Sequence, residues 1–454
     1  MKKNNMLTGS PIKTIVFFSL PIMLSSLLQY NYSLVDNIIV GRYVSTDALA
    51  AVGNVGPIGS FLIGAAFGLT SGFTIPVAHA FGAGDKRKLS HYAGNSITIS
   101  AIVGVAIIIV AHILTRPLLK AIGTPSEIID LSAAYMNILY FGVPFQMLSN
   151  NFTAISRAVG ESKKPLYFFI VSVIVNFVLD LLFVKNFKWG VEGAAWATLI
   201  ANAVAALLTG IYVIKYNKDV EIKKSDLKPN MATAWEQIKL GIPVSLQFTI
   251  TSIGSMCLQS AVNSFGANVI AGFTAASRVE NLTNIPMSGL GVATQTFVGQ
   301  NYGARNYERI TKSVKKIFIA DIVVSVIMSL TLYLIGLPTV SLFMTEPNAA
   351  IMAAAKQYII ATAECYSLVA ILFVLRNTLQ GLGFTYSNMI AGAGEFFGRL
   401  AVAFIFTKII GFNAVCYAAP AAWLLADIPL AIIYLSKHKK FKALAAEQKA
   451  KNNI

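Results

Sequence analysis

Charged residues are scarce in this chain of 454 residues. Asp, Glu, Lys and Arg together make up 12% of it, and soluble domains carry about twice that share. Hydrophobic residues make up 56%, and the mean hydropathy is +0.65. Apolar stretches run throughout the chain and leave no segment from which a large soluble core could be built. The composition therefore favours a protein embedded in a membrane.

Motifs of ATP hydrolysis and of metal catalysis are absent from the sequence. There is no G-x-x-x-x-G-K-[ST] loop, so ATP is not expected to be the direct energy source. The four histidines are scattered, without an H-E-x-x-H pair or a Cys/His cluster, so we expect no metal site and no cofactor. Cys257, Cys365 and Cys416 are isolated and indicate free thiols rather than disulfides. We therefore predict that the protein is not an enzyme.

Apolar segments long enough to cross a membrane recur twelve times along the chain. A span needs about 20 mainly apolar residues. Backbone groups in lipid must be hydrogen-bonded within the segment, so each span is expected to be a helix. The expected spans are 14–40, 52–80, 92–115, 132–156, 165–185, 193–215, 239–262, 272–300, 317–337, 351–378, 386–408 and 413–436.

Lys and Arg are distributed unevenly over the connections between these spans. Counting alternate connections, one side and the C-terminal tail together hold 26 of them, and the opposite side holds 7. This positive-inside pattern predicts a multi-pass protein of the cell membrane, that is, of a bacterial inner or plasma membrane, with both termini cytoplasmic. The net charge of +16 then requires no nucleic acid as a partner, because anionic lipid headgroups suffice.

The chain also repeats itself at an offset of about 222 residues. The tripeptide at 20–22 matches that at 242–244, and the one at 81–83 matches that at 302–304. Two further pairs of segments keep the same order, at offsets of 221 to 223. Each half holds an even number of spans, so the two halves have the same orientation and form a parallel repeat.

The duplication predicts an all-α integral membrane protein with twelve transmembrane helices in two six-helix bundles. The first bundle is expected at 1–215 and the second, with a basic cytoplasmic tail, at 237–454. The segment 216–236 is polar and mixed in charge, so we expect a flexible cytoplasmic linker there. Such an architecture suits alternating access, in which the two halves move as near-rigid bodies.

Two aspartates stand inside otherwise apolar spans. Asp36 ends a charge-free stretch that begins at Thr14, and Asp180 ends another that begins at Pro165. An Asp at mid-helix costs about 2.5–3.5 kcal/mol on insertion scales, so both side chains are expected to face a protein interior or an aqueous cavity. An ionisable group held in this way is typical of a machine coupled to protons or sodium.

Other polar side chains share helical faces with the two aspartates. In the first span two of them lie four and seven residues before Asp36, and in the fifth span one lies four residues before Asp180. Together with a hydroxyl of the sixth span, they are Gln29, Tyr32, Asn176 and Thr198. These oxygens could hold a sodium ion or share a proton with the carboxyl groups. The alternative is a set of buried hydrogen bonds that fixes helix packing.

The second half lacks an equivalent of this acidic pattern. The position matching Asp36 is Leu258, and the nearest polar residue is Gln247, so cation coupling is expected in the first half alone. Pro21, matched by Pro243, either bends the first span or marks its start.

Charges of the second half have other expected roles. Glu395 and Arg399 are four residues apart and predict a pair within one helix. Asp321 follows Lys316 closely and is expected at the membrane interface.

Taken together, these features resemble the multidrug and toxic compound extrusion (MATE) family of secondary transporters, over nearly the whole chain. The specific marks are V-D-N-I-I-V-G at 35–41, V-G-Q-N-Y-G-A at 298–304, and Asn176 with Asp180. In that family an aspartate of helix one and an Asn and an Asp of helix five form a cation site. The resemblance implies such a site here, with these members: Asp36, Asn176 and Asp180, with Gln29, Tyr32 and Thr198 at compatible positions.

The resemblance also implies a function. Members export amphipathic, often cationic, organic compounds in exchange for protons or sodium, and the substrate would bind in a largely apolar cavity. Candidates for lining it are Met256, Phe273, Met287 and Tyr366. The expected partners are drug-like small molecules and membrane lipids, with the protein acting as a monomer. The alternative is a lipid-linked oligosaccharide flippase of the same superfamily, which should show a strongly cationic cavity.

Overall fold

The computed structural model describes residues 6–121, 123–342 and 348–452, and every regular element in these ranges is a helix. The helices of the first half are α1 (Pro11–Tyr43), α2 (Thr46–Phe73), α3 (Ile75–Gly82), α4 (Lys86–Ala121), α5 (Ile129–Ala158), α6 (Lys163–Asp180), the π-helical η1 (Leu181–Asn186), α7 (Gly190–Ile211) and the π-helical η2 (Tyr212–Tyr216). Those of the second half are α8 (Met231–Asn263), α9 (Ala267–Gly303), α10 (Tyr307–Ser341), α11 (Ala349–Glu364), α12 (Tyr366–Gly381), α13 (Tyr386–Ala401), the π-helical η3 (Val402–Phe406), α14 (Thr407–Ile410), α15 (Phe412–Cys416) and α16 (Ala418–Asn452).

Each predicted span corresponds to one of these helices or to consecutive ones. Within the described ranges, nine helices are long and apolar enough to cross a membrane, and α11 with α12, bent by 53°, makes a tenth. The more polar helices α5 and α9, of 30 and 37 residues, complete the twelve. The prediction of a duplicated all-α membrane protein with twelve spans is confirmed.

The chain folds into two compact units whose boundaries lie inside helices. Of the described residues, the first unit comprises 24–245 and the second comprises 6–23 and 246–452. The chain thus passes from one unit to the other within α1 and again within α8, at positions 222 residues apart. This offset equals that of the sequence repeat. Pro21 lies inside α1 just before the first crossing, and Pro243 lies inside α8 just before the second, so neither proline marks a helix start.

In the first unit, α5 packs against α2, α4 and α7, and α6 packs against α7. The start of α8 closes this unit against α2, where an added Cβ at Gly68 would lie 2.6 Å from the Cα of Ser245. Only small residues permit two helices to approach so closely.

The predicted linker differs from expectation, because it packs on the first unit. The Leu227 carbonyl accepts a hydrogen bond from Thr98 Oγ1 at 2.7 Å, and the Asn230 amide donates to Asn95 Oδ1 at 2.9 Å. Val220 is buried as well. Side chains of α4 therefore bind the backbone of a segment whose composition predicted flexibility.

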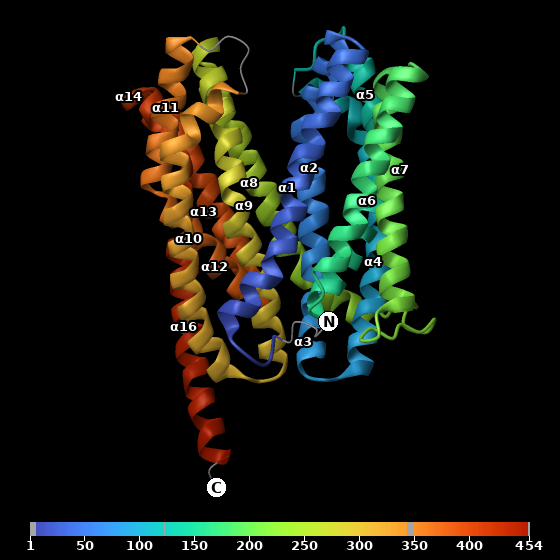
Figure 1. Ribbon diagram of the computed structural model, residues 1–454, viewed down its shortest axis with the longest axis vertical. Coiled ribbons are helices and arrows are strands. Elements are labelled where there is room, and N and C mark those ends of the chain that lie inside the picture. Colours follow the sequence, from blue (N-terminus) through green and yellow to red (C-terminus); the bar gives the residue numbers. More distant parts are fainter. Residues whose placement is uncertain (1–5, 122, 343–347, 453–454) are drawn as a thin grey trace. The chain divides into compact units, whose positions relative to one another are not determined.

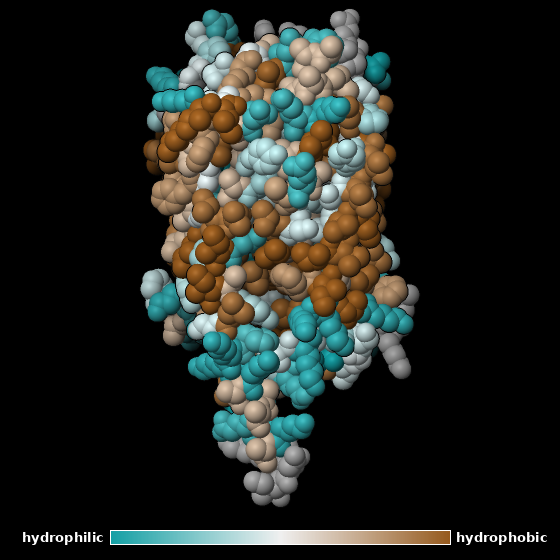
Figure 2. Space-filling view, turned by 90° about the vertical axis from the view of Figure 1, so that its left-hand side faces the viewer, coloured by the Kyte–Doolittle hydropathy of each residue, from teal (hydrophilic) through white to brown (hydrophobic). Residues whose placement is uncertain are grey.

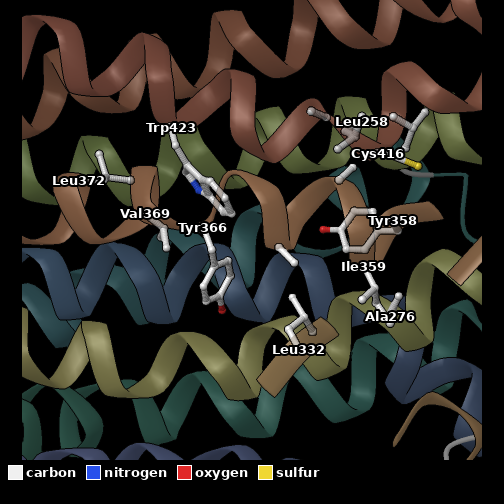
Figure 3. Packing of buried hydrophobic residues seen from close by; sticks show 14 of the residues in the cluster. Leu258, Ala276, Leu332, Tyr358, Ile359, Tyr366, Val369, Leu372, Cys416 and Trp423 are labelled. Carbon is white, nitrogen blue, oxygen red and sulfur yellow. The ribbon is translucent and has the colours of Figure 1, made fainter. Parts of the chain in front are cut away.

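In the second unit, α9 packs against α10, α11 and α12, and α13 packs against α16. Its apolar core includes Tyr358, Tyr366 and Trp423, which Figure 3 shows among neighbouring aliphatic side chains. The segment that begins at Met6 belongs to this unit, and Arg309 of α10 donates to the carbonyls of Met6, Thr8 and Gly9, at 3.0 to 3.3 Å. The Met6 side chain is fully buried.

Within each unit the long helices lie side by side along the vertical direction of Figure 1, and the last turns of α16 extend beyond the other helices of its unit. On the face shown in Figure 2, a broad apolar band separates polar ends. Exposed apolar residues along α10, among them Ile319, Val323, Ile327 and Leu330, are suited to contact with lipid tails.

Candidate functional site

Three helices of the first unit bring a small polar cluster together. Asp36 comes from α1, Asn176 and Asp180 come from α6, and Thr198 comes from α7. With its amide nitrogen facing the carboxylates, the orientation that satisfies its neighbours, Asn176 donates to Asp36 Oδ1 at 3.0 Å and to Asp180 Oδ2 at 3.3 Å. A single amide therefore holds two acidic groups side by side.

The hydroxyl of Tyr32 joins α1 to both other helices. It lies 3.1 Å from the amide oxygen of Asn176 and 3.2 Å from Thr198 Oγ1. Because a phenol carries one proton, it donates to one of these oxygens at a time. Hydrogen bonds thus connect five of the six residues predicted for the cation site.

Gln29 is the sixth, and the structure places it apart from the cluster. Its side chain is exposed, two turns before Asp36 on α1. Among the hydrogen bonds of the described residues, none joins Gln29 to the cluster. The reason is that spacing along a helix gives a shared face but does not determine which turns of that face meet a neighbouring helix.

The backbone changes geometry directly after Asp180. There α6 ends and the wider π-helical turn of η1 begins. Such turns occur frequently at functional sites. About two turns before Asp180, Ser172 Oγ donates to the carbonyl of Ala201 at 2.9 Å and joins α6 to α7. The site therefore lies between a helix pair joined by this hydrogen bond and the π-helical turn of η1.

The electrostatics of the cluster favour a bound cation. Asp180 is fully buried, Asp36 is half-buried, and Asp180 Oδ1 has no hydrogen-bond partner within the described residues. The ion pairs found in that part of the chain include neither aspartate. Unpaired carboxylates are costly in an apolar interior. A proton or a small cation relieves that cost, and amide, phenol and hydroxyl oxygens are ligands that hard cations accept.

Tyr135 is a member of this region that the sequence analysis missed. It lies on α5 and is buried among residues of α1, α5 and α7. It is also close enough to Asp36 and Asp180 for an electrostatic interaction with both carboxyl groups. A single tyrosine in an apolar span looks the same in sequence whether it belongs to a site or to the core, so the sequence gave no signal for Tyr135.

The four residues predicted to line a substrate cavity have different surroundings. Phe273, Met287 and Tyr366 are buried in the core of the second unit, packed among residues of neighbouring helices. Met256 of α8 is 37% exposed and stays a candidate for contact with substrate.

Charged groups of the second unit form a different arrangement. Glu395 of α13 pairs with Arg399 at 3.2 Å, as predicted, and also with Arg376 of α12, which was not predicted. Asp427 of α16 lies near this trio and is buried too. The prediction that Asp321 lies at the interface is wrong: its side chain is fully buried, because neighbouring helices cover that side of α10.

Comparison with known proteins agrees with the duplication. A profile of the family MatE matches residues 21–182 and again 243–405. The chain is 28% identical over 378 residues to the "Probable multidrug resistance protein YoeA" of Bacillus subtilis (strain 168), covering 82% of this chain and 81% of that protein. It is 25% identical over 436 residues to the "Multidrug export protein MepA" of Staphylococcus aureus (strain MSSA476), covering 95% of each.

A solved structure is similar over almost the whole length. It is described as an outward-facing conformation of a multidrug resistance MATE family transporter, with a TM-score of 0.89, 25% identity, and coverage of 98% of this chain and 99% of that one. The two profile matches begin 222 residues apart, which is the offset found between the halves of this sequence. The chain therefore belongs to the MatE family of multidrug and toxic compound extrusion transporters.

Proposed function

We propose that this protein exports amphipathic, often cationic, organic compounds from the cell in exchange for protons or sodium ions. The observation that carries the proposal is that Asp36 and Asp180 both accept hydrogen bonds from the amide of Asn176. Neither carboxylate has a basic partner among the ion pairs of the described residues. The relatives named for multidrug resistance and multidrug export support the substrate class. The protein acts without a cofactor, as a monomer in the cell membrane, with lipids as its surroundings and both termini in the cytoplasm.

The coupling step is the filling and emptying of the site between Asp36 and Asp180. With the site empty, two negative charges on neighbouring helices repel each other, so α1 and α6 are pushed apart at this level. A bound proton or sodium ion removes the repulsion and draws Asp36 toward α6. Ion binding thus changes the position of the C-terminal part of α1, which carries Asp36.

The path of α1 through the fold extends this local change. The helix runs continuously from residues of the second unit to Asp36 in the first, and Pro21 removes one backbone hydrogen bond near the crossing. A helix weakened at that point bends there when its C-terminal part moves. Ion binding in one unit is thereby transmitted toward the other, which is what alternating access requires.

A lipid-linked oligosaccharide flippase is not favoured by this structure. Such a protein needs uncompensated basic groups to bind pyrophosphate. The largely buried Arg376 and Arg399 are instead bound to Glu395.

Transport in proteoliposomes tests the proposal. A fluorescent organic cation should move against its gradient when either a sodium gradient at constant pH or a pH gradient in sodium-free buffer is imposed. Transport on a pH gradient alone identifies the proton as the coupling ion, and strict sodium dependence identifies sodium. Movement that ignores both gradients contradicts the proposed function.

A further inference from the structure

Near the start of α4, one face of the helix is covered by the chain's own segment 217–233, which leads from η2 into α8. Four residues of α4 contact that segment: His91, Gly94, Asn95 and Thr98. The approach is close, because an added Cβ at Gly94 would lie 2.5 Å from the carbonyl oxygen of Asp226. His91 Nε2 lies 3.0 Å from Thr233 Oγ1. In the first unit, none of these four residues is exposed.

The equivalent face of α10 is open. Helix α10 repeats α4 at an offset of 221, which is the offset between the tripeptides at 81–83 and 302–304. The four covered positions of α4 correspond on α10 to Lys312, Lys315, Lys316 and Ile319. All four of these side chains are exposed. Within the described part of the second unit, nothing covers this face in the way that 217–233 covers α4.

The repeats differ here because the chain takes different paths around equivalent points. Val220 and Phe441 are 221 residues apart, and both are buried. In the first unit η2 ends at Tyr216, and the chain then turns back over α4. In the second unit α16 continues as a helix to Asn452, past the other helices of its unit (Figure 1). The end of α16 therefore leaves this face of α10 uncovered.

The open face combines positive charge with apolar surface. Lys312 pairs with Glu308 at 2.6 Å. Lys315 and Lys316 enter none of the ion pairs found among the described residues. One turn further along α10, Ile319 is 55% exposed and begins the apolar stripe suited to lipid tails. On the face drawn in Figure 2, hydrophilic side chains likewise border the lower end of the apolar band. Two uncompensated charges thus stand where the apolar surface begins.

From this geometry we propose that the open face of α10 binds an anionic phospholipid. The phosphate lies against Lys315 and Lys316, because lysine binds phosphate as a point charge. One acyl chain follows Ile319 and Val323, which share a helical face with the two lysines. Basic groups beside a membrane surface attract anionic lipids. A zwitterionic lipid lacks the net negative charge, and a free phosphate ion leaves the apolar stripe uncovered, so an anionic lipid fits both parts of the face.

The segment that covers α4 has the same two properties. It contacts the helix through Asp226 and Leu227, an acidic residue followed by an apolar one. The lipid site lies beyond the proposed function, since it touches neither the transported ion nor the exported compound. It also assigns one lipid class to one surface of the second unit, whereas the surplus charge of the whole chain predicts only a general attraction to the membrane.

Lipid binding to the purified full-length protein in detergent is the test. Dioleoyl phosphatidylglycerol is titrated against dioleoyl phosphatidylcholine at constant total lipid. Bound lipid is counted by native mass spectrometry, and the melting temperature is recorded beside it. Wild type should retain phosphatidylglycerol in preference. The Lys315→Gln/Lys316→Gln variant should bind it about thirtyfold more weakly, the effect of two lysines that each contribute about 1 kcal/mol near an anionic surface.

A matched control and an apolar variant sharpen the test. Lys163→Gln/Lys164→Gln changes two adjacent exposed lysines at the start of α6 and should leave the preference unchanged. Ile319→Ser keeps both lysines of α10 and should weaken lipid binding severalfold, because the acyl chain loses apolar contact. Equal losses in the two lysine variants would overturn the proposal, since general surface charge would then suffice. Stabilisation by sodium phosphate alone, or retention of a peptide of residues 221–230 in place of the lipid, would also overturn it.

Discussion

Helices α6 and α13 occupy equivalent positions in the two repeats, but the acidic group on each has different partners. Residues of α6 map onto α13 at the offset of 222, and a π-helical segment follows each of them, η1 and η3. On α6 the acidic group is Asp180, beside Asn176 and Asp36. On α13 it is Glu395, between two arginines. The backbone geometry is kept in both halves, and the charge that could exchange an ion is present in one.

The difference supports the proposal that ion coupling belongs to the first unit. Glu395 is neutralised by groups that cannot leave, so binding another cation there would cost the energy of breaking two ion pairs. Asp36 and Asp180 are held by the amide of Asn176, which orients them without neutralising them. A site that has to fill and empty in every cycle needs the second arrangement. The duplicated helices thus have similar backbones, and the proposed mechanism assigns ion exchange to the aspartate pair of the first unit.

The largest effect is expected from removing the exchangeable charge. Asp36→Asn and Asp180→Asn should each abolish export driven by an ion gradient, because the remaining carboxylate has no partner to repel. Expression and folding should stay intact, since an amide still accepts hydrogen bonds. Uptake of a fluorescent cation into inverted vesicles measures this. Asp130→Asn, a matched change of an exposed aspartate in the same unit, serves as the control. Near wild-type transport in both single variants would contradict a coupling role for Asp36 and Asp180.

Glu395→Gln should damage stability rather than coupling. The change takes the paired counter-charge away from the largely buried Arg376 and Arg399, and breaking a buried ion pair in this way costs about 3–5 kcal/mol. Thermal unfolding in detergent should show the loss. Replacing all three residues by apolar ones, Arg376→Met/Glu395→Leu/Arg399→Met, should recover most of it. If Glu395→Gln unfolds like wild type, the trio has no structural role.

Asn176→Leu should have an intermediate effect. Hydrogen bonds to charged groups contribute about 1.5–3 kcal/mol, so losing the amide should raise the ion concentration needed for half-maximal transport roughly tenfold or more. The control is Asn31→Leu, because Asn31 is exposed on α1 and, among the described residues, its side chain donates to the carbonyl of Leu27 alone. Equal ion dependence in the two variants would remove Asn176 from the site.

Gln29→Ala should have the smallest effect, a change in transport rate of less than about twofold, as is usual for exposed side chains away from special features. Its side chain is exposed and lies apart from the cluster. Rates measured over a series of ion concentrations settle the point. A shift in ion dependence as large as that of Asn176→Leu would place Gln29 in the site after all.

The sequence predicted the helices and most members of the polar cluster for physical reasons. Apolar stretches of about 20 residues have one stable structure in lipid, and a carboxylate within such a stretch is rare enough to stand out. The spacing of Asn176 and Asp180 placed them on one face, and the structure joins them to Asp36.

Features that depend on neighbouring helices could not be predicted. Tyr135 resembles any core tyrosine, and Asp321 is close in sequence to lysines but is covered by packing. The segment 216–236 has a flexible composition and is held by hydrogen bonds from α4. The passage of α1 and α8 between the units leaves no trace in composition, because an apolar helix can pack on either side.

Counter-ion flux driven by substrate tests most directly the claim that Asp36 and Asp180 couple an ion to export. Proteoliposomes are given an organic cation on one side, with no ion gradient, and the movement of protons and sodium is followed beside exchange of labelled for unlabelled substrate. Wild type should move ions opposite to the substrate. The Asp36→Asn/Asp180→Asn variant should exchange substrate yet move no ions, since the step that links them is gone. Ion movement at the wild-type ratio in that variant would contradict the account.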